Sequence, residues 1–300
     1  MLRYPSAMPN SVTVRVPATS ANLGPGFDSL GLALAITQEI TLALGPQPES
    51  KDGLAKLVLD AARSAYRLAR VEVPELCATP GAGAIPIGRG LGASAAARAA
   101  GIVGANALLG GALTDNQLLV LGAGLEGHAD NMAPALFGGL RVVVRDGDGY
   151  RHIAAPLAPG LKIALFIPSF EMPTGESRKL LPKELSKEDA VHNIGRAALL
   201  VAALATGAWS ALDLATQDRM HQPARTKIFP AMPEIFVAAK EAGALCAYLS
   251  GGGSTIAAFA LDGAEPIAEA MQQRAAALGY PGRVAVTEPS DTGATVVATA

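Results

Sequence analysis

The first half of the chain alternates between short apolar runs and longer stretches with apolar residues at helical spacing. Strict apolar and polar alternation indicates a half-buried strand, and a recurrence every three to four residues indicates an amphipathic helix. Thr114-Asp-Asn-Gln117 reads as a capping box at a helix start. The pattern predicts strands over residues 12–16, 40–44 and 140–145, and helices over 54–69, 93–109 and 114–126.

The second half follows a different order. Its pattern predicts strands over 161–167, 245–249, 255–261 and 283–287, and helices over 191–205, 210–219, 231–242 and 265–278. When the two middle helices are set aside, the order is βαββαβ, which suggests a ferredoxin-like sandwich. The segment 146–160 is rich in turn residues. We therefore expect two domains, residues 1–155 and 156–300.

A glycine-rich stretch enters the second predicted helix. Gly88, Gly90 and Gly92 alternate, and Ala93-Ser94-Ala-Ala-Ala follows without a helix breaker. Glycine lets a backbone bend and approach a ligand, and alanine favours a helix. A helix N-terminus presents unpaired N–H groups and a positive dipole end, which suit phosphate. The hydroxyl of Ser94 would be free for a metal ion or a phosphate oxygen.

Other interpretations of this stretch are open when it is taken alone. A Walker P-loop requires a lysine that is absent here. The spacing Gly88-x-Gly90-x-x-Ala93 fits a dinucleotide fingerprint, but that motif follows a buried strand, and residues 79–87 make a poor strand. A glycine-rich loop that merely caps a helix is the third possibility.

Two further polar clusters lie beside turns. The segment 17–28, Pro-Ala-Thr-Ser-Ala-Asn-Leu-Gly-Pro-Gly-Phe-Asp, could project Asn22 and Asp28 from one rigid turn, or Asp28 could simply cap the Ser29-Leu-Gly-Leu-Ala-Leu segment. Glu126, His128, Asp130 and Asn131 crowd an otherwise apolar stretch before a Gly-Gly turn. Four such residues together favour a functional site.

These segments resemble the GHMP kinase superfamily. Pro-x-Gly-x-Gly-Leu-Gly-x-Ser-Ala-Ala is similar to its phosphate loop, and residues 249–255, Leu-Ser-Gly-Gly-Gly-Ser-Thr, are similar to its third motif. The segment 17–28 and the pattern Glu-Gly-His-x-Asp-Asn-x-Ala-Pro-Ala resemble the homoserine kinases in particular, as do the stretches around Arg178 and Arg225.

The resemblance implies an α+β fold with two domains: an N-terminal ATP-binding domain of the ribosomal-S5-domain-2-like type and a ferredoxin-like C-terminal domain. It implies that ATP and Mg²⁺ serve to phosphorylate L-homoserine to O-phospho-L-homoserine, on the way to threonine, in a cleft between the domains. Another small alcohol as acceptor, or a catalytically inactive ligand-binding protein, are the alternatives.

The resemblance also assigns site residues. ATP would be bound by Pro86, Gly88, Arg89, Gly90, Leu91, Gly92, Ala93, Ser94 and Ala95, and Mg²⁺ by Ser94 and Glu126. Homoserine would be bound by Asn22, Asp28, His128, Asn131, Thr174, Arg178, Arg225 and Gly252. Asn22, Asp28, Ser94 and Glu126 would be the catalytic group. Asp28 would pair with the ammonium, Asn22 would orient the hydroxyl, and the two arginines would hold the carboxylate.

Two positions depart from the family pattern, because Ala93 and Ser254 replace a usual serine and a usual proline. The second replacement is expected to loosen its loop.

Composition limits the classes of partner that this protein is expected to bind. The net charge is −2 and 17% of the 300 residues are charged, so nothing suggests a basic nucleic-acid-binding surface. The most apolar predicted helix is too short to span a bilayer, and Cys77 and Cys246 have no metal or redox spacing. We expect no membrane partner, reduced cysteines in a cytoplasmic protein and, from the resemblance, a homodimer.

Overall fold

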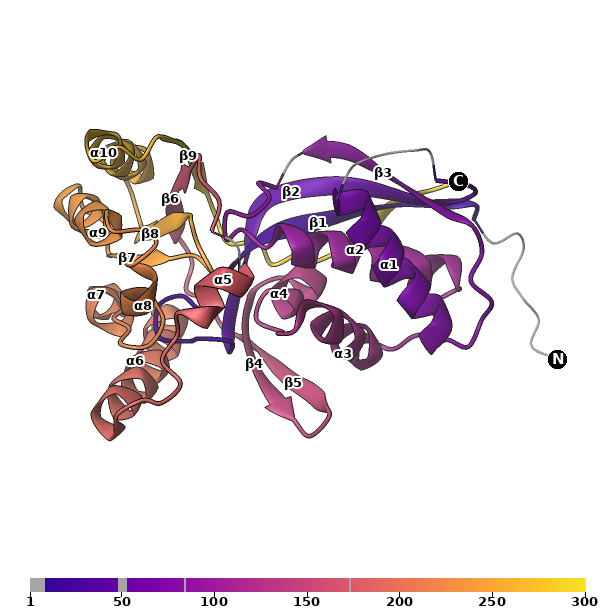
Figure 1. The fold of residues 1–300 in the computed structure, drawn as a ribbon, viewed down its shortest axis with the longest axis horizontal. Helices are drawn as coiled ribbons and strands as arrows, with labels where there is room; N and C mark the ends of the chain where they lie inside the picture. The colour runs from indigo at the N-terminus through magenta and orange to yellow at the C-terminus, as the bar shows by residue number, and fades with distance from the viewer. Residues whose placement is uncertain (1–8, 48–52, 84, 173) are drawn as a thin grey trace.

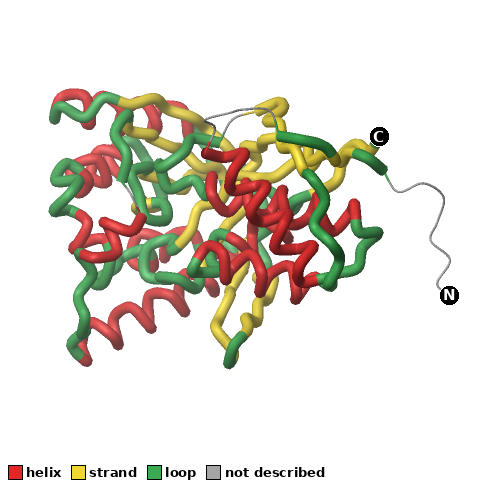
Figure 2. The backbone as a smooth tube through the Cα atoms, turned by 45° about the vertical axis from the view of Figure 1, so that its right-hand side comes forward, coloured by secondary structure: helices red, strands yellow, loops and turns green. Residues whose placement is uncertain are grey.

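The computed structural model describes residues 9–47, 53–83, 85–172 and 174–300, and it shows two layered α+β units side by side (Figure 1). The first unit contains a six-stranded antiparallel sheet in the order β10-β1-β2-β4-β5, with β3 paired to β2. Four helices cover one face of this sheet (Figure 2). The elements are β1 (Ser11–Ala21), β2 (Leu30–Leu44), α1 (Gly53–Leu68), β3 (Leu76–Gly83), α2 (Ala93–Leu108), α3 (Asp115–Glu126), α4 (Met132–Phe137), β4 (Leu140–Asp146), β5 (Gly149–Ala155) and β10 (Thr295–Thr299).

The second unit has a four-stranded antiparallel sheet in the order β7-β8-β6-β9. In sequence terms this is second, third, first and fourth strand, so the predicted ferredoxin-like order is confirmed. Its elements are β6 (Lys162–Pro168), α5 (Thr174–Lys179), α6 (Lys187–Thr206), the 3₁₀ helix η1 (Trp209–Ala211), α7 (Leu212–Ala215), α8 (Gln222–Arg225), α9 (Met232–Glu241), β7 (Cys246–Leu249), β8 (Ile256–Ala260), α10 (Ala264–Ala277) and β9 (Gly282–Thr287).

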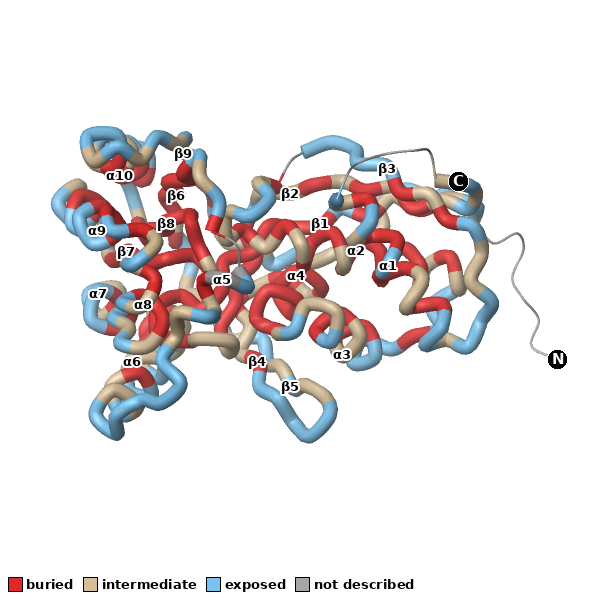
Figure 3. The backbone as a smooth tube through the Cα atoms, viewed as in Figure 1, coloured by how far each residue is buried: buried red, intermediate tan, exposed pale blue. Residues whose placement is uncertain are grey.

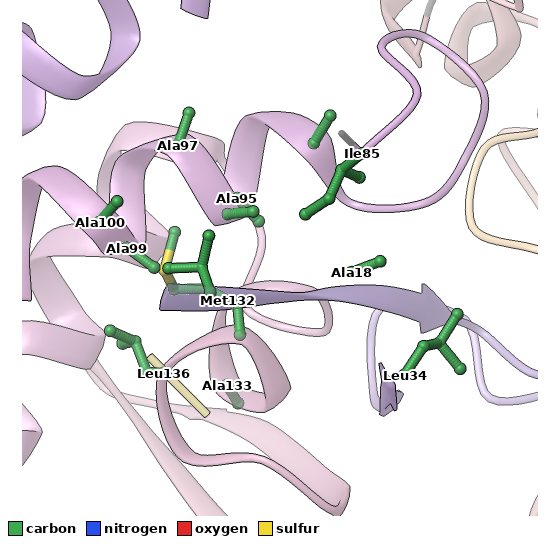
Figure 4. Close-up of a cluster of buried hydrophobic side chains, with 14 of the residues drawn as sticks. Ala18, Leu34, Ile85, Ala95, Ala97, Ala99, Ala100, Met132, Ala133 and Leu136 are labelled. Atoms are coloured by element: carbon green, nitrogen blue, oxygen red, sulfur yellow. The ribbon is translucent and has the colours of Figure 1, made fainter. Parts of the chain in front are cut away.

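Small side chains let α2 pack closely in the first core. Most of its alanines are almost fully buried, and Figure 4 shows Ala95 and Ala99 of α2 near Met132 of α4. A side chain at Gly101 would lie 2.2 Å from the carbonyl oxygen of Val58, so α1 and α2 are in backbone contact. The close packing fixes the N-terminus of α2 at the boundary with the second unit.

The structure corrects several predicted strands. β2 begins at Leu30 rather than residue 40, because residues 30–34 are all buried and therefore do not alternate. Residues 79–83, judged a poor strand, belong to β3, which is an edge strand and so tolerates Pro80. The strands β5 and β10 were not predicted.

Predicted helices also shifted. The helix expected over 210–219 is η1 followed by α7, a separate short helix α8 comes next, and α5 was not foreseen. The helix expected from residue 191 begins at Lys187, because the hydroxyl of Ser186 caps the N–H of Asp189 at 3.0 Å.

The C-terminal strand joins the first sheet, since β10 pairs antiparallel with β1. The domain boundary placed at 155/156 falls between β5 and β6 and stays a prediction. Buried backbone runs through both sheets, whereas the β4–β5 hairpin is largely exposed (Figure 3). Among the described residues, no helix combines the length and apolarity needed to cross a bilayer.

Candidate active site

A cavity of about 220 Å³ lies where the two units meet. Segments from both units line it: the turn after β1, the start of α2, the end of α3, α5, α8 and the turn between β7 and β8. Its lining residues are Asn22, Phe27, Asp28, Leu54, Leu57, Ile87, Gly88, Gly90, Gly92, Ala93, Ser94, Glu126, His128, Asp130, Asn131, Arg178, Arg225, Gly251, Gly252 and Gly253.

The first glycine-rich loop enters α2 at one wall of the cavity. Gly90 and Gly92 have φ values of 76° and 68°, the left-handed region that favours glycine. A side chain at Gly90 would lie 2.2 Å from the carbonyl oxygen of Ser250, and one at Gly92 would lie 1.9 Å from Oγ1 of Thr19. Both positions therefore require glycine, and the unpaired N–H groups at the start of α2 are well placed for an anion.

The second glycine loop is tied to the first. Ser250 Oγ donates to the carbonyl of Gly90 at 2.7 Å, and the N–H of Thr255 donates to the carbonyl of Arg89 at 2.9 Å. Ser254 does not leave its loop free, because its hydroxyl donates to the carbonyl of Phe170 at 2.8 Å. The two loops form one connected wall.

Ser94 and Glu126 meet at the cavity surface. Ser94 Oγ donates to Glu126 Oε1 at 2.5 Å, and the guanidinium of Arg98 pairs with the other carboxylate oxygen. Arg98 lies one helical turn after Ser94, and this spacing was the available signal for a partner that sequence reasoning missed. The two adjacent oxygens suit a hard divalent cation, which commonly takes only one or two protein ligands beside phosphate and water.

Asp28 and Arg178 form an ion pair across the cavity. Nη1 and Nη2 of Arg178 donate to the two carboxylate oxygens at 3.0 and 2.5 Å. Burial opposes the charge of Arg178, but the hydrogen bond and attraction of Asp28 outweigh it and raise the pKa. Asn22 holds Asp28 in place: its Oδ1 accepts from the N–H of Asp28 at 3.0 Å, and its Nδ2 donates to the carbonyl of Gly251 at 2.9 Å.

Arg225 is the second cation of the cavity and is 1% exposed. Its Nη1 lies 2.6 Å from Nδ1 of His221 and 3.2 Å from the carbonyl oxygen of Gly251. Burial first, then repulsion from Arg178, lowers the pKa of Arg225 to about 10. The ring of Phe27 lies under both guanidiniums, with centroid distances of 5.1 Å to Arg178 and 5.8 Å to Arg225. Neither Phe27 nor His221 was foreseen as a site residue.

The polar cluster after α3 forms the third side of the cavity. His128 Nδ1 lies 2.7 Å from Asp130 Oδ1, which also accepts from the N–H of Asn131 at 2.8 Å. Burial disfavours protonated His128, but the hydrogen bond to Asp130 outweighs this and raises the pKa. Asn131 Oδ1 accepts from Thr19 Oγ1 at 2.8 Å.

Most predicted site residues therefore line one cavity. Four predicted ATP-binding residues do not: Leu91 and Ala95 are buried in the core, Pro86 lies away from the cavity, and Arg89 is turned towards β6. The guanidinium of Arg89 donates to the carbonyls of Pro168 and Ser169 at 2.9 and 2.8 Å. Thr174 begins α5, and its side chain lies outside the described part of the structure.

Comparison with protein-family models identifies two matching regions. Residues 49–139 match the GHMP kinases N terminal domain, and residues 200–277 match the GHMP kinases C terminal region. Homoserine kinase of Moorella thermoacetica is 42% identical over 293 residues, covering 95% of this chain and 99% of that protein. Homoserine kinase of Deinococcus radiodurans is 41% identical over 266 residues, covering 82% and 83%.

Solved structures agree with these relatives. The crystal structure of homoserine kinase from Cytophaga hutchinsonii superposes with a TM-score of 0.87 at 30% identity, covering 99% of this chain and all of that one. Lactococcus lactis galactokinase complexed with galactose has a TM-score of 0.70 at 16% identity, covering 97% and 96%, and at that identity it shows the fold alone. The predicted two-domain α+β fold is thereby confirmed.

Proposed function

The chain belongs to the GHMP kinases and, among them, to the homoserine kinases; from this premise we propose that it transfers the γ-phosphoryl group of ATP to the hydroxyl of L-homoserine. The observation that carries the proposal is the shared cavity, because a helix start suited to phosphate and a cluster able to bind an amino acid both line it. The product would be O-phospho-L-homoserine, an intermediate on the way to threonine.

ATP would lie along the two glycine loops. The N–H groups at the start of α2 would bind the phosphates, and the apolar side chains of Leu54, Leu57 and Ile87 offer the adenine ring a surface. We infer that Mg²⁺ is the divalent ion and that Ser94 and Glu126 hold it, since both are oxygen ligands at the cavity surface. When bound, this ion neutralises charge that develops on the phosphates.

Homoserine would lie beside the charged and polar residues of the same cavity. The ammonium would take Asp28, and the carboxylate would take Arg225 and Arg178, because a guanidinium fork matches a carboxylate. The Asn22 amide already donates one hydrogen bond and accepts another within the protein, so its main role would be to hold Asp28 in place. Only its second amide hydrogen or its other lone pair could hydrogen-bond the substrate hydroxyl. His128, Asn131 and Gly252 line the same cavity.

Phosphoryl transfer depends mainly on positioning and charge stabilisation, so a dedicated base is not required. The residues that do this work here come from both units and are tied to one another through Gly251 and Gly90. A rigid connection between the two loops would keep the acceptor hydroxyl in line with the γ-phosphate.

Family membership also supports two broader proposals, that the protein acts in the cytoplasm and that it forms a homodimer. Sedimentation of the purified protein tests the second.

The decisive experiment incubates the purified protein with ATP and Mg²⁺ and, separately, homoserine, mevalonate, galactose and threonine. Phosphohomoserine should be the main product. Preferential phosphorylation of mevalonate or galactose would point to another small-alcohol kinase, and no phosphorylation at all would indicate an inactive ligand-binding protein.

A further inference from the structure

His221 is a fully buried histidine whose two ring nitrogens face groups from both units. Its Nε2 lies 2.7 Å from the carbonyl oxygen of Gly24, in the turn after β1 that carries Asn22 and Asp28. Its Nδ1 lies 2.6 Å from Nη1 of Arg225, one turn later on α8. The ring thus bridges the two segments that hold opposite ends of the proposed acceptor.

These partners determine the protonation of the ring. A carbonyl oxygen can only accept, so Nε2 must carry a hydrogen, and a guanidinium can only donate, so Nδ1 must be bare. Only the neutral Nε2–H tautomer satisfies both contacts. Burial lowers the pKa of His221 to about 4 and outweighs the attraction of Asp218, in agreement with this tautomer.

The surroundings hold the ring in this orientation. Asp218 accepts the backbone N–H groups of His221 and Gln222 at 2.8 and 2.6 Å, and its carboxylate lies 3.8 Å from Nε2. The ring of Phe27 also packs against the His221 ring, at a centroid distance of 5.5 Å. The charged groups acting on the ring are Asp218, Arg225 and Asp28.

We propose that His221 is a positioning residue: its bare Nδ1 holds the guanidinium of Arg225 towards the acceptor, and its Nε2–H ties Arg225 to the turn that bears Asn22 and Asp28. The inference rests on the proposed function. The His221 ring fixes α8 relative to the turn after β1, although no backbone hydrogen bond joins these two segments among the described residues. Homoserine binding should depend on this link more than ATP binding does.

Two variants separate the contacts. In His221→Gln the amide nitrogen can replace Nε2 and still donate to Gly24, but no acceptor remains at the Nδ1 position. In His221→Asn the amide oxygen can replace Nδ1 and accept from Arg225, but the side chain is too short for Gly24. A hydrogen bond to a charged group is worth enough to expect a roughly 10- to 100-fold higher homoserine KM in His221→Gln. His221→Asn should stay within about fivefold of the native KM.

This order is opposite to that of a residue that only fills space. Glutamine is closer to histidine in volume, so a purely structural role would make His221→Gln the milder variant. ATP KM should change little in either. His152→Gln is the matched control, because His152 stacks on Phe137 at 4.5 Å and lies outside the cavity.

A measurement on the native protein covers the case in which a variant does not fold. In ¹⁵N-histidine-labelled protein, one buried histidine should show a protonated Nε2 and a bare Nδ1 that do not titrate between about pH 8 and about pH 5.5. A protonated Nδ1, ordinary titration, or equal homoserine KM values in the two variants would overturn the inference. If native protein does not phosphorylate homoserine at all, the proposed function itself has failed, which the native assay reports separately.

Discussion

Arg225 provides the sharpest test of the acceptor, because it is a buried cation whose hydrogen-bond partners among the described residues carry no full negative charge. Those partners are His221 Nδ1 and the carbonyl of Gly251. The lowering of its pKa from 12.5 to about 10 means that the charged form costs the folded protein roughly 3 kcal/mol of free energy. A substrate carboxylate would supply the missing partner.

Removing the guanidinium of Arg225 should therefore cause a large loss of kcat/KM for homoserine. Arg225→Ala leaves the bound carboxylate partly unpaired, at a cost of roughly 2–5 kcal/mol, so kcat/KM for homoserine should fall by about 30-fold to several thousand-fold. Arg225→Lys should recover only part of this, since an ammonium keeps the charge and loses the fork. The loss of kcat/KM for homoserine in Arg178→Ala should be smaller than that in Arg225→Ala by a factor of about ten or more, because Arg178 is 35% exposed and already paired with Asp28.

The assay compares homoserine with 3-aminopropan-1-ol, which keeps the amine and the hydroxyl and lacks the carboxylate. Native protein should strongly prefer homoserine, and Arg225→Ala should narrow the preference, since the group that the amino alcohol fails to satisfy is gone. Arg274→Ala is the control, because this α10 arginine pairs with Glu234 outside the cavity. Equal use of both acceptors by native protein would refute the reasoning.

Three further predictions concern the metal, the ammonium and pH. Glu126→Gln should lower kcat by roughly 100-fold or more, which is a larger loss than in Ser94→Ala, and added Mg²⁺ should partly rescue both variants. Near-native activity of Glu126→Gln at low Mg²⁺ would show that the assignment of the two residues as metal ligands is wrong. Asp28→Asn should raise the homoserine KM with little change for ATP, whereas a collapse of kcat with unchanged homoserine binding would identify a base instead. The free energy of unfolding should decrease by about 3 kcal/mol as pH falls from 6.5 through about 4, because in this range His221 is neutral in the folded protein and protonated in the unfolded chain. Denaturant titrations of native protein and His221→Gln should differ in this slope, and parallel slopes would contradict the assigned pKa.

The parts of the fold that sequence reasoning captured are those specified locally. Alternating glycines before an alanine run determine the loop at the start of α2, because these residues act through their own backbone. The strand β10 was not predicted, because it is a mostly exposed edge strand that depends mainly on its pairing with β1, and Thr295 pairs with Arg15 at the other end of the chain. The burial of residues 30–34 removed the alternation that marks a strand.

The candidate site shows the same division. Motif resemblance named Asp28 and Arg178 separately, but their mutual ion pair depends on a contact 150 residues apart in the chain. His221 was visible beside Arg225 in the sequence, yet only the fold brings its other nitrogen to Gly24. Partners of this kind are set by tertiary packing and have no local signature.

The charge arrangement explains why the acceptor should be a zwitterion. Asp28 and Arg178 neutralise each other, and among the described residues no carboxylate is in direct contact with Arg225. A lone amine would have to displace Arg178 from Asp28 and would leave two cations unpaired, whereas a lone carboxylate could pair with Arg225 and leave the existing ion pair intact. We therefore expect kcat/KM to decrease from homoserine to 4-hydroxybutyrate to 3-aminopropan-1-ol. The reverse order of the two analogues would mean that the ammonium contact at Asp28, and not the buried cation, dominates recognition.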